Sequence, residues 1–278
     1  MAGVNCNAGQ VTVPIYELDA AGNVKPNPLF HRPVDLLHSR CVEYPFAAWQ
    51  LAGGTKVLDV GTVKADKAWH LWLEQLPIEV HATDYDEPYA PFENVTFHRA
   101  DLRDLPFQSD SFDRILAVSV IEHIGLADPQ VVAEQKPEVD PEGDLNAFKE
   151  LLRVLAPGGL IVMTFPFGLD DKVVLGSART YTGESIGRFN GLAQPVRLDY
   201  YEYQYAHYQN LCAPPPQTRG RIAARLFPAP ARVLKPVPAY SIPELPGQAT
   251  WRKIPMEDAQ ATNETHIEGV LCGVWRKS

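Results

Sequence analysis

The chain has 278 residues, 45% of them hydrophobic, which is enough for a packed core in one large domain or two small ones. A formal net charge of −9 argues against a nucleic-acid backbone as the main partner and favours a small neutral or cationic ligand. No apolar run approaches the roughly 20 residues of a membrane span, no secretory signal pattern opens the chain, and the cysteines lack zinc or redox spacing, so we expect a cytoplasmic protein with reduced thiols.

The first predicted elements precede the main domain. Residues 1–33 are mixed and rich in turn formers, and we interpret them as an N-terminal arm. The domain is expected to span residues 34–278. Residues 34–52 carry apolar side chains at helical spacing, interrupted near Pro45, which predicts a helical pair.

A rhythm of strands and helices follows. Apolar or alternating segments predict strands, and amphipathic segments predict helices; the second helix is expected to stop at Pro157-Gly158-Gly159. This alternation predicts an α/β fold with a doubly wound, mostly parallel sheet. The expected strands are 56–60, 78–84, 95–101, 112–120 and 160–168, and the expected helices are 66–76 and 145–159.

The pattern changes after residue 170. Residues 180–189 predict a short helix, 196–205 a strand and 269–277 a last strand. An insertion at residues 213–247 contains nine prolines, a density that blocks regular structure. It is either an irregular surface excursion or a lid over the sheet edge.

Polar residues follow the predicted parallel strands, where ligands bind in such sheets. Asp59 and Gly61 follow the first strand, and glycine lets the backbone approach a ligand. Asp84 ends the second strand, and its carboxylate can accept hydrogen bonds from both hydroxyls of a ribose. Asp86 is a neighbouring alternative, and either acid could instead be a solvated turn residue. Asp101 follows the third strand and could accept from an exocyclic amine.

Two titratable residues follow the fourth strand in the segment SVIEHIG. Glu122 and His123 are candidate bases, because they follow a buried strand at the ligand-binding edge. We rank His123 first, since imidazole titrates near neutral pH. The alternative is that Glu122 orients a backbone or ligand group and that His123 packs at the start of a helix.

Taken together, the segments VLDVG, HATDYD, ADLRDLPFQSDSFDRI, SVIEH and ELLRVLAPGGLIVMTFP resemble class I S-adenosylmethionine-dependent methyltransferases. The resemblance implies a seven-stranded sheet with an antiparallel last strand and S-adenosylmethionine as the cofactor. It also implies a set of cofactor contacts. Asp59 and Gly61 would border the methionine part, Asp84 would hold the ribose, Asp101 and Leu102 the adenine, and Val118 and Ser119 would line the underside.

The opening turn departs from this family. Val63 stands where members usually carry glycine, and Ala65 where they often carry glycine or alanine. We interpret the difference as an altered turn, because the downstream acids are present. A lost cofactor site, and with it a non-catalytic scaffold, is the alternative.

A second resemblance concerns HSRCVEYPFA and the segments EHIGL and DPEGDLNAFKELLRVLAPGG, which are similar to methyltransferases of bacterial saccharide-modifying clusters. In such enzymes the segment before the first strand folds over the cofactor, so Arg40, Glu43 and Tyr44 are candidates. Arg40 could pair with the cofactor's carboxylate. Alternatively, Arg40 and Glu43 form an ion pair on a helix surface.

The acidic segment EQKPEVDPEGD suggests a metal site. Asp140 and Asp144 supply the hard oxygen ligands that suit Mg²⁺, which could lower the pKa of a bound hydroxyl. The alternative is a solvated loop in which Asp144 caps the following helix. A tyrosine-rich stretch at residues 199–208 suits sugar rings or aromatic acceptors, or is only a β-prone strand.

The sequence therefore predicts an O-methyltransferase of a small saccharide or a saccharide-bearing metabolite, with His123 or Glu122 as the base. Alternatives are a methyltransferase of a non-sugar small molecule, a non-catalytic scaffold and a nicotinamide-dependent oxidoreductase. The last lacks a complete G-x-G-x-x-G motif. We expect no nucleic-acid or membrane partner, and a homo-oligomer is possible.

Overall fold

The computed structural model describes residues 16–25, 27, 29–30, 38–127, 131, 133, 137–174, 176–204, 250–264 and 267–278. Its centre is an eight-stranded sheet with the strand order β3-β2-β1-β4-β5-β10-β8-β9. The first five strands in this order run parallel, and β10, β8 and β9 each pair antiparallel with the preceding neighbour. The strands are β1 (Lys56–Val60), β2 (Glu79–Asp84), β3 (Val95–Arg99), β4 (Phe112–Val118), β5 (Leu155–Pro166), β8 (Gln194–Gln204), β9 (Thr250–Ile254) and β10 (Gly269–Arg276).

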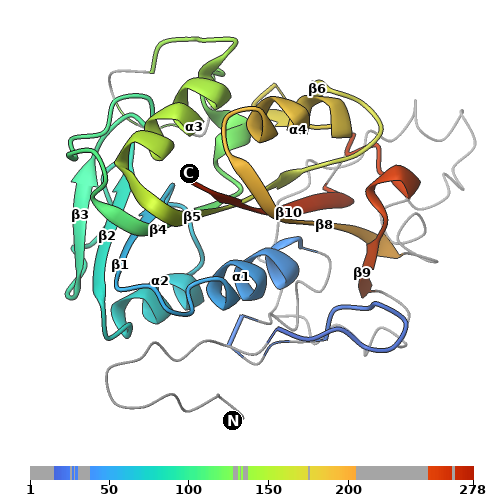
Figure 1. The fold of residues 1–278 in the computed structure, drawn as a ribbon, viewed down its shortest axis with the longest axis horizontal. Coiled ribbons are helices and arrows are strands. Elements are labelled where there is room, and N and C mark those ends of the chain that lie inside the picture. The colour runs from blue at the N-terminus through green and yellow to red at the C-terminus, as the bar shows by residue number, and fades with distance from the viewer. Residues whose placement is uncertain are drawn as a thin grey trace, which may run out of the picture.

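Helices cover both faces of this sheet (Figure 1). Helices α1 (Arg40–Trp49) and α2 (Lys67–Glu74) lie on one face, and α3 (Gly143–Val154) and α4 (Gly183–Asn190) lie on the other. The described chain also forms a small hairpin and two 3₁₀ turns. These are β6 (Lys172–Val174), β7 (Ala178–Thr180), η1 (Ile121–His123) and η2 (Met256–Asp258).

The central strands are apolar because both of their faces are covered. Successive side chains of a strand point to opposite faces, so Val57 packs on the side of α1 and α2 while Leu58 packs on the side of α3 and α4. Leu116 and Ile115 of β4 divide in the same way. The near-continuous apolar runs of the sequence therefore correspond to strands buried on both sides.

Three details of the predicted fold are wrong. The sheet has eight strands rather than seven, because β9 adds antiparallel to the edge strand β8. Pro45 does not break a helical pair, since it lies inside α1, whose apolar face is buried; packing outweighs the one backbone hydrogen bond that proline removes. Helix α3 ends at Val154, and Pro157-Gly158-Gly159 falls within β5.

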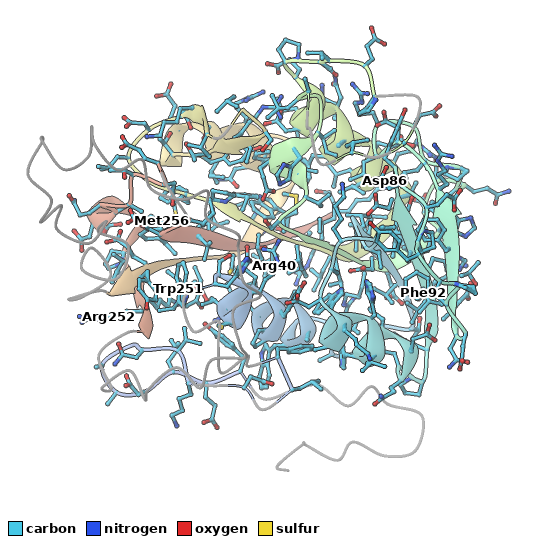
Figure 2. The ribbon with its side chains drawn as sticks, turned by 180° about the vertical axis from the view of Figure 1, so that it is seen from behind. Arg40, Asp86, Phe92, Trp251, Arg252 and Met256 are labelled. Carbon is cyan, nitrogen blue, oxygen red and sulfur yellow. The ribbon has the colours of Figure 1, made fainter. Side chains whose placement is uncertain are left out.

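The described part of the N-terminal arm pairs with the edge strand β9. Val24 N donates to Trp251 O at 2.8 Å, and Lys253 N donates to Gly22 O at 2.9 Å. Figure 2 labels Trp251 and Arg252 on this strand. The division into an arm and a domain stays a prediction, and the insertion at residues 213–247 lies outside the described residues. None of the helices in the described ranges combines the length and apolar character that crossing a bilayer requires.

Candidate functional site

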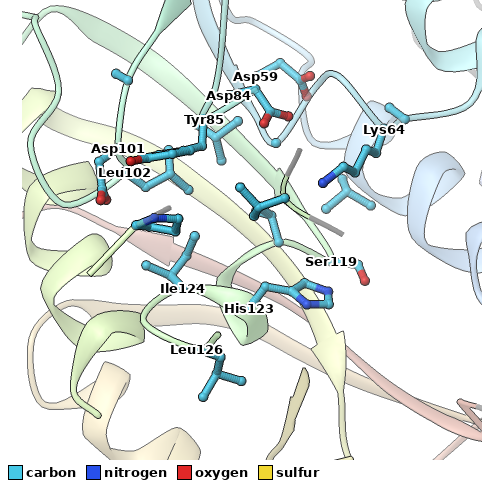
Figure 3. Close-up of a pocket in the computed structure, with 18 of the residues that line it drawn as sticks. Asp59, Lys64, Asp84, Tyr85, Asp101, Leu102, Ser119, His123, Ile124 and Leu126 are labelled. Carbon is cyan, nitrogen blue, oxygen red and sulfur yellow. The ribbon is translucent and has the colours of Figure 1, made fainter. Parts of the chain in front are cut away.

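A cavity of about 220 Å³ opens at the carboxyl ends of the parallel strands. The chain leaves β1 for β2 and β3 on one side and returns to β4 on the other, so β1 and β4 form the switch point at which such sheets bind ligands. The cavity is lined by all eight residues that the sequence assigns to the cofactor and by the candidate base His123. These residues are Arg40, Asp59, Gly61, Asp84, Asp101, Leu102, Val118, Ser119 and His123. Figure 3 labels six of them, namely Asp59, Asp84, Asp101, Leu102, Ser119 and His123.

The turn after β1 is built tightly around Gly61. Its φ of +74° favours glycine, and a Cβ atom there would lie 2.5 Å from Val120 Cγ2. Two residues later, Val63 N donates to Asp84 Oδ2 at 2.8 Å. The Val63 side chain is 8% exposed and is not part of the cavity wall. The unusual valine therefore leaves the cavity open.

Asp84 ends β2 with its carboxylate in the cavity wall. Its Oδ2 accepts from Val63 N and its Oδ1 accepts from Asp86 N at 3.0 Å. Each carboxylate oxygen can accept a further hydrogen bond, so two acceptor positions remain for a diol. Burial raises the pKa of Asp84, although the two backbone N–H groups and Lys64 oppose the rise.

Asp86, the alternative to Asp84, has a different environment. It is 1% exposed and is absent from the cavity wall. One oxygen lies 3.0 Å from Lys64 Nζ, and the other accepts from Ala133 N at 2.8 Å. The geometry therefore favours Asp84 for the ribose.

Asp59 lines the same cavity, but each of its oxygens is bonded to a protein side chain and the residue is 2% exposed. Its Oδ2 accepts from Thr62 Oγ1 at 2.6 Å, and its Oδ1 accepts from Trp69 Nε1 at 3.0 Å. Burial raises the pKa of Asp59 to about 7. Its side chain thus fixes the turn after β1 against α2.

Asp101 lies near Leu102 at the side of the cavity opposite Ser119 and His123 (Figure 3). Arg103 donates two hydrogen bonds to its carboxylate, from Nε to Oδ1 at 3.0 Å and from Nη2 to Oδ2 at 2.7 Å. Burial acts to raise the pKa of Asp101, but the hydrogen bonds from Arg103 lower it below its usual value. Arg103 therefore fixes the orientation of the Asp101 carboxylate.

Sequence reasoning missed several residues of the cavity wall. Lys64, Tyr85 and Arg103 line it, and each stands one to three residues from a residue that was predicted. Their position just after β1, β2 and β3 was the available signal. Apolar wall residues Ile124 and Leu126 follow η1 in the same way.

Ser119 leaves β4 in a left-handed conformation, with φ at +51°. Its N–H donates to Thr164 O at 2.9 Å, and its hydroxyl donates to Glu122 Oε1 at 2.5 Å. Glu122 is 1% exposed, and burial raises its pKa. Its Oε2 has no hydrogen-bond partner among the described residues, and the side chain does not line the cavity.

His123 presents a basic nitrogen. Its Nδ1 lies 2.7 Å from Ser177 O. Because a carbonyl oxygen only accepts, Nδ1 must carry the hydrogen, and in the neutral ring Nε2 holds the lone pair. Nε2 lies 3.8 Å from Glu122 Oε1. His123 thus has the tautomer that a general base in this cavity needs.

Helix α1 supplies the wall that the second resemblance implies. Arg40 lies at the start of α1 near the middle of the molecule (Figure 2) and bonds Glu43. Tyr44 stacks on Trp69 with ring centroids 4.6 Å apart. Arg40 and Tyr44 both line the cavity, whereas Glu43 lies behind them and is 1% exposed. The Arg40–Glu43 pair is therefore not a surface ion pair.

The candidate metal ligands are held by separate partners. Asp140 accepts from Glu142 N and Asn146 Nδ2, both at 2.9 Å. Asp144 is fully buried and accepts from Tyr181 Oη at 3.1 Å. The described residues contain no group of three or more His, Cys, Asp or Glu side chains that could hold a metal. The N-cap of α3 is Glu142, so Asp144 does not cap this helix.

The tyrosine-rich strand faces the core rather than the cavity. Tyr200, Tyr201 and Tyr203 of β8 are all buried, at most 8% exposed, and none lines the cavity. The other two tyrosines of this stretch lie outside the described residues. The described tyrosines therefore serve packing, which was the simpler of the two interpretations.

The wall as a whole suits an adenosine with a charged tail. Asp84 offers acceptors to hydroxyls, Leu102 and Val118 offer apolar surface, and Tyr44 and Tyr85 offer flat rings. Arg40 adds a guanidinium that can meet a carboxylate.

Comparison with known proteins agrees with this geometry. The family described as a methyltransferase domain, Methyltransf_11, matches residues 58–163. Residues 58–163 of the chain therefore carry a methyltransferase domain. The predicted family, enzyme class and cofactor are thereby confirmed. No curated protein matches the chain.

Solved structures that resemble this methyltransferase include the MccD protein, at 14% identity and a TM-score of 0.47, with 81% of this chain and 90% of that chain covered. A SAM-dependent methyltransferase of Thermotoga maritima is 15% identical at a TM-score of 0.40, with 87% of each chain covered. The cyclase SpnF is 18% identical at a TM-score of 0.42, with 54% of this chain covered. This chain spans 55% of the SpnF chain.

Proposed function

We propose that this methyltransferase methylates a hydroxyl oxygen of a small molecule, with His123 as the general base. The observation that carries the proposal is the 2.7 Å contact between Nδ1 of the cavity residue His123 and Ser177 O, which makes Nε2 the basic nitrogen of the neutral ring. An alcohol is a poor nucleophile while protonated, so a hydroxyl acceptor needs such a base.

The cofactor, when bound, supplies a methyl group that is electrophilic because it is attached to a sulfonium. The acceptor oxygen would take this methyl group, and His123 Nε2 would accept the hydroxyl proton. Asp84 would hold the ribose hydroxyls, and Arg40 a carboxylate of the ligand. Glu122, 3.8 Å from Nε2, would stabilise the imidazolium once it forms. Binding in a cavity excludes water and aligns the reactants.

The acceptor class we propose is a saccharide or a saccharide-bearing metabolite. Its support is the resemblance of residues 38–47 and of the segment around His123 to saccharide-modifying methyltransferases. The cavity wall provides His123 and Lys64 as polar groups beside apolar Ile124 and Leu126, which is compatible with a polyhydroxylated ring. A non-sugar alcohol is the alternative outcome of the test.

The test is a transfer assay with isotope-labelled S-adenosylmethionine and a panel of saccharides and non-sugar alcohols, read by mass spectrometry. A gain of one methyl mass on a sugar hydroxyl is expected. Methylation of amines alone would refute the O-methyltransferase, and cofactor binding without turnover on any acceptor would favour the non-catalytic scaffold.

The role of His123 has its own test. His123→Gln should lower kcat by roughly 10²-fold or more, since general base catalysis contributes about that much, while cofactor affinity changes little. His98→Gln is the matched control, because His98 lies on β3 and is absent from the cavity wall. Equal turnover of the two variants would clear His123 as the base.

A further inference from the structure

A buried polar chain connects helix α1 to the turn that carries the proposed base. Arg40 Nη1 bonds Glu43 Oε2, and Thr164 Oγ1 donates to Glu43 Oε1 at 2.8 Å. Ser119 N lies 3.1 Å from Thr164 Oγ1. Ser119 Oγ then donates to Glu122 Oε1, beside His123. We call Arg40, Glu43, Thr164, Ser119 and Glu122 the buried polar chain.

The direction of its hydrogen bonds is fixed by chemistry. An ionised carboxylate only accepts, so the single hydroxyl hydrogen of Thr164 must go to Glu43. The Thr164 hydroxyl oxygen is then left to accept from Ser119 N–H, as the longer branch of a bifurcated bond whose shorter branch ends at the backbone oxygen of Thr164. The hydroxyl of Thr164, which lies on β5, therefore connects the Glu43 carboxylate of α1 to the backbone of the turn after β4.

Three of these groups are almost completely buried. Glu43 is 1% exposed, Thr164 is 0% exposed and Glu122 is 1% exposed. Burying a carboxylate is unfavourable unless charges and hydrogen bonds compensate it, and apolar side chains usually stabilise a core at least as well. The buried polar chain also includes Ser119, whose φ of +51° is a conformation that non-glycine residues adopt when their surroundings enforce it.

From this arrangement we infer that Glu43 is a positioning residue. It holds the Arg40 guanidinium in the cavity wall, and through Thr164 it holds the Ser119 turn that orients Glu122 and His123. One buried carboxylate thus couples the ligand-binding side of the cavity to the base. The part that concerns His123 rests on the proposed function, whereas the part that concerns Arg40 depends only on cofactor binding.

Glu43→Gln tests the first part. Glutamine keeps the size of the side chain and an oxygen that accepts from Thr164, but it loses the charge that holds Arg40. The dissociation constant of S-adenosylhomocysteine, measured by calorimetry, should rise about tenfold or more, as for the loss of a hydrogen bond to a charged group. This readout needs no acceptor, so it remains decisive even if the enzyme proves not to methylate hydroxyls.

The matched control for this variant is Glu150→Gln. Glu150 also pairs with an arginine three residues away on its helix, at 2.6 Å from Arg153, and also accepts from another element, Leu105 N at 2.8 Å. It is absent from the cavity wall. Its substitution should leave the dissociation constant unchanged. Equal behaviour of the two variants would overturn the role of Glu43.

Thr164→Val tests the second part, because valine has the same shape but no hydroxyl. We expect kcat to fall at least about tenfold with a smaller change in KM, and Thr164→Ser to restore kcat, since serine returns the hydroxyl. Wild-type kcat in the valine variant, or no rescue by serine, would refute the connection to His123. Thermal unfolding of each variant identifies any that do not fold. If Thr164→Val does not fold, kcat of Thr164→Ser is compared with that of the wild type, and a kcat well below the wild-type value would refute the connection.

Discussion

At the scale of single residues, two acids at the ends of neighbouring strands differ in their hydrogen-bond partners and in their burial. Asp59 accepts from the side chains of Thr62 and Trp69 and is buried, whereas Asp84 accepts from two backbone N–H groups and is only partly buried. Both line the cavity. The sequence shows that an acid ends each strand, but the partners of each acid depend on side chains from other elements.

Asp84→Ala should weaken cofactor binding. It removes the acceptors proposed for the ribose and also the anchor of Val63 N, so we expect the affinity for S-adenosylhomocysteine to fall about tenfold or more. Calorimetry measures this directly. Asp258→Ala, at an exposed position of η2, is the control. An unchanged dissociation constant for the Asp84 variant would remove it from the site.

Asp59 should make stability depend on pH. Its pKa is raised by burial from 3.8 to about 7, so between these values the folded protein binds a proton that the unfolded chain has released. The stability that Asp59 contributes is therefore fully present below pH 3.8 and is lost as the pH rises through about 7. Asp59→Asn removes the effect. The free energy of unfolding of the wild type, minus that of the variant, should be larger at about pH 5 than at about pH 8; a difference independent of pH would contradict the shift.

At the scale of elements, the loop after β4 is fastened to the start of α3. Asp140 N donates to Gly125 O at 2.9 Å, and Arg179 Nη1 donates to Ile124 O at 2.6 Å. Gly125 has a φ of +79°, and a Cβ atom there would lie 2.1 Å from Asp140 O. The position of η1, and with it His123, therefore depends on a close backbone contact.

Gly125→Ala should lower the free energy of unfolding by about 2 kcal/mol or more, because it adds a steric conflict to backbone strain. Gly158→Ala separates the two effects. Gly158 has a φ of +75°, but no atom lies within 4 Å of its added Cβ, so its substitution should cost only about 1–2 kcal/mol. Urea unfolding of both variants is the measurement, and equal losses would show that the contact with Asp140 is not tight.

The elements also show how far sequence reasoning reaches. Apolar runs identified β1, β4 and β5, because strands that are buried on both faces carry apolar side chains at nearly every position, and an alternating run identified β2. Strand β9 was missed: its five residues pair with β8 only after a long intervening segment. Pro45 misled because its local cost is overridden by packing of α1. The acids of the cavity wall were predicted because they follow strand ends. The Glu43–Thr164 contact joins residues 121 positions apart, so no local sequence pattern predicts it.

At the scale of the whole molecule, ligand binding should appear as stability. A ligand that binds only the folded state adds roughly 2.7 kcal/mol when present at about 100 times its dissociation constant. We expect S-adenosylmethionine and S-adenosylhomocysteine to raise the melting temperature and NAD to leave it unchanged. The Asp84→Ala variant should show a smaller rise at the same ligand concentration. A response to NAD alone would contradict the cofactor contacts described above.

The walls of the cavity come from one stretch of the chain. Every lining residue falls between Arg40 and Pro137, and none of the described residues after Pro137 contributes. The later strands β8, β9 and β10 complete the sheet without forming this wall. The lining side chains thus come from the first half of the chain, whereas Thr164 and Ser177 of the second half hold Glu43, Ser119 and His123 from outside the cavity. A different C-terminal portion grafted onto this first half would have to reproduce those contacts.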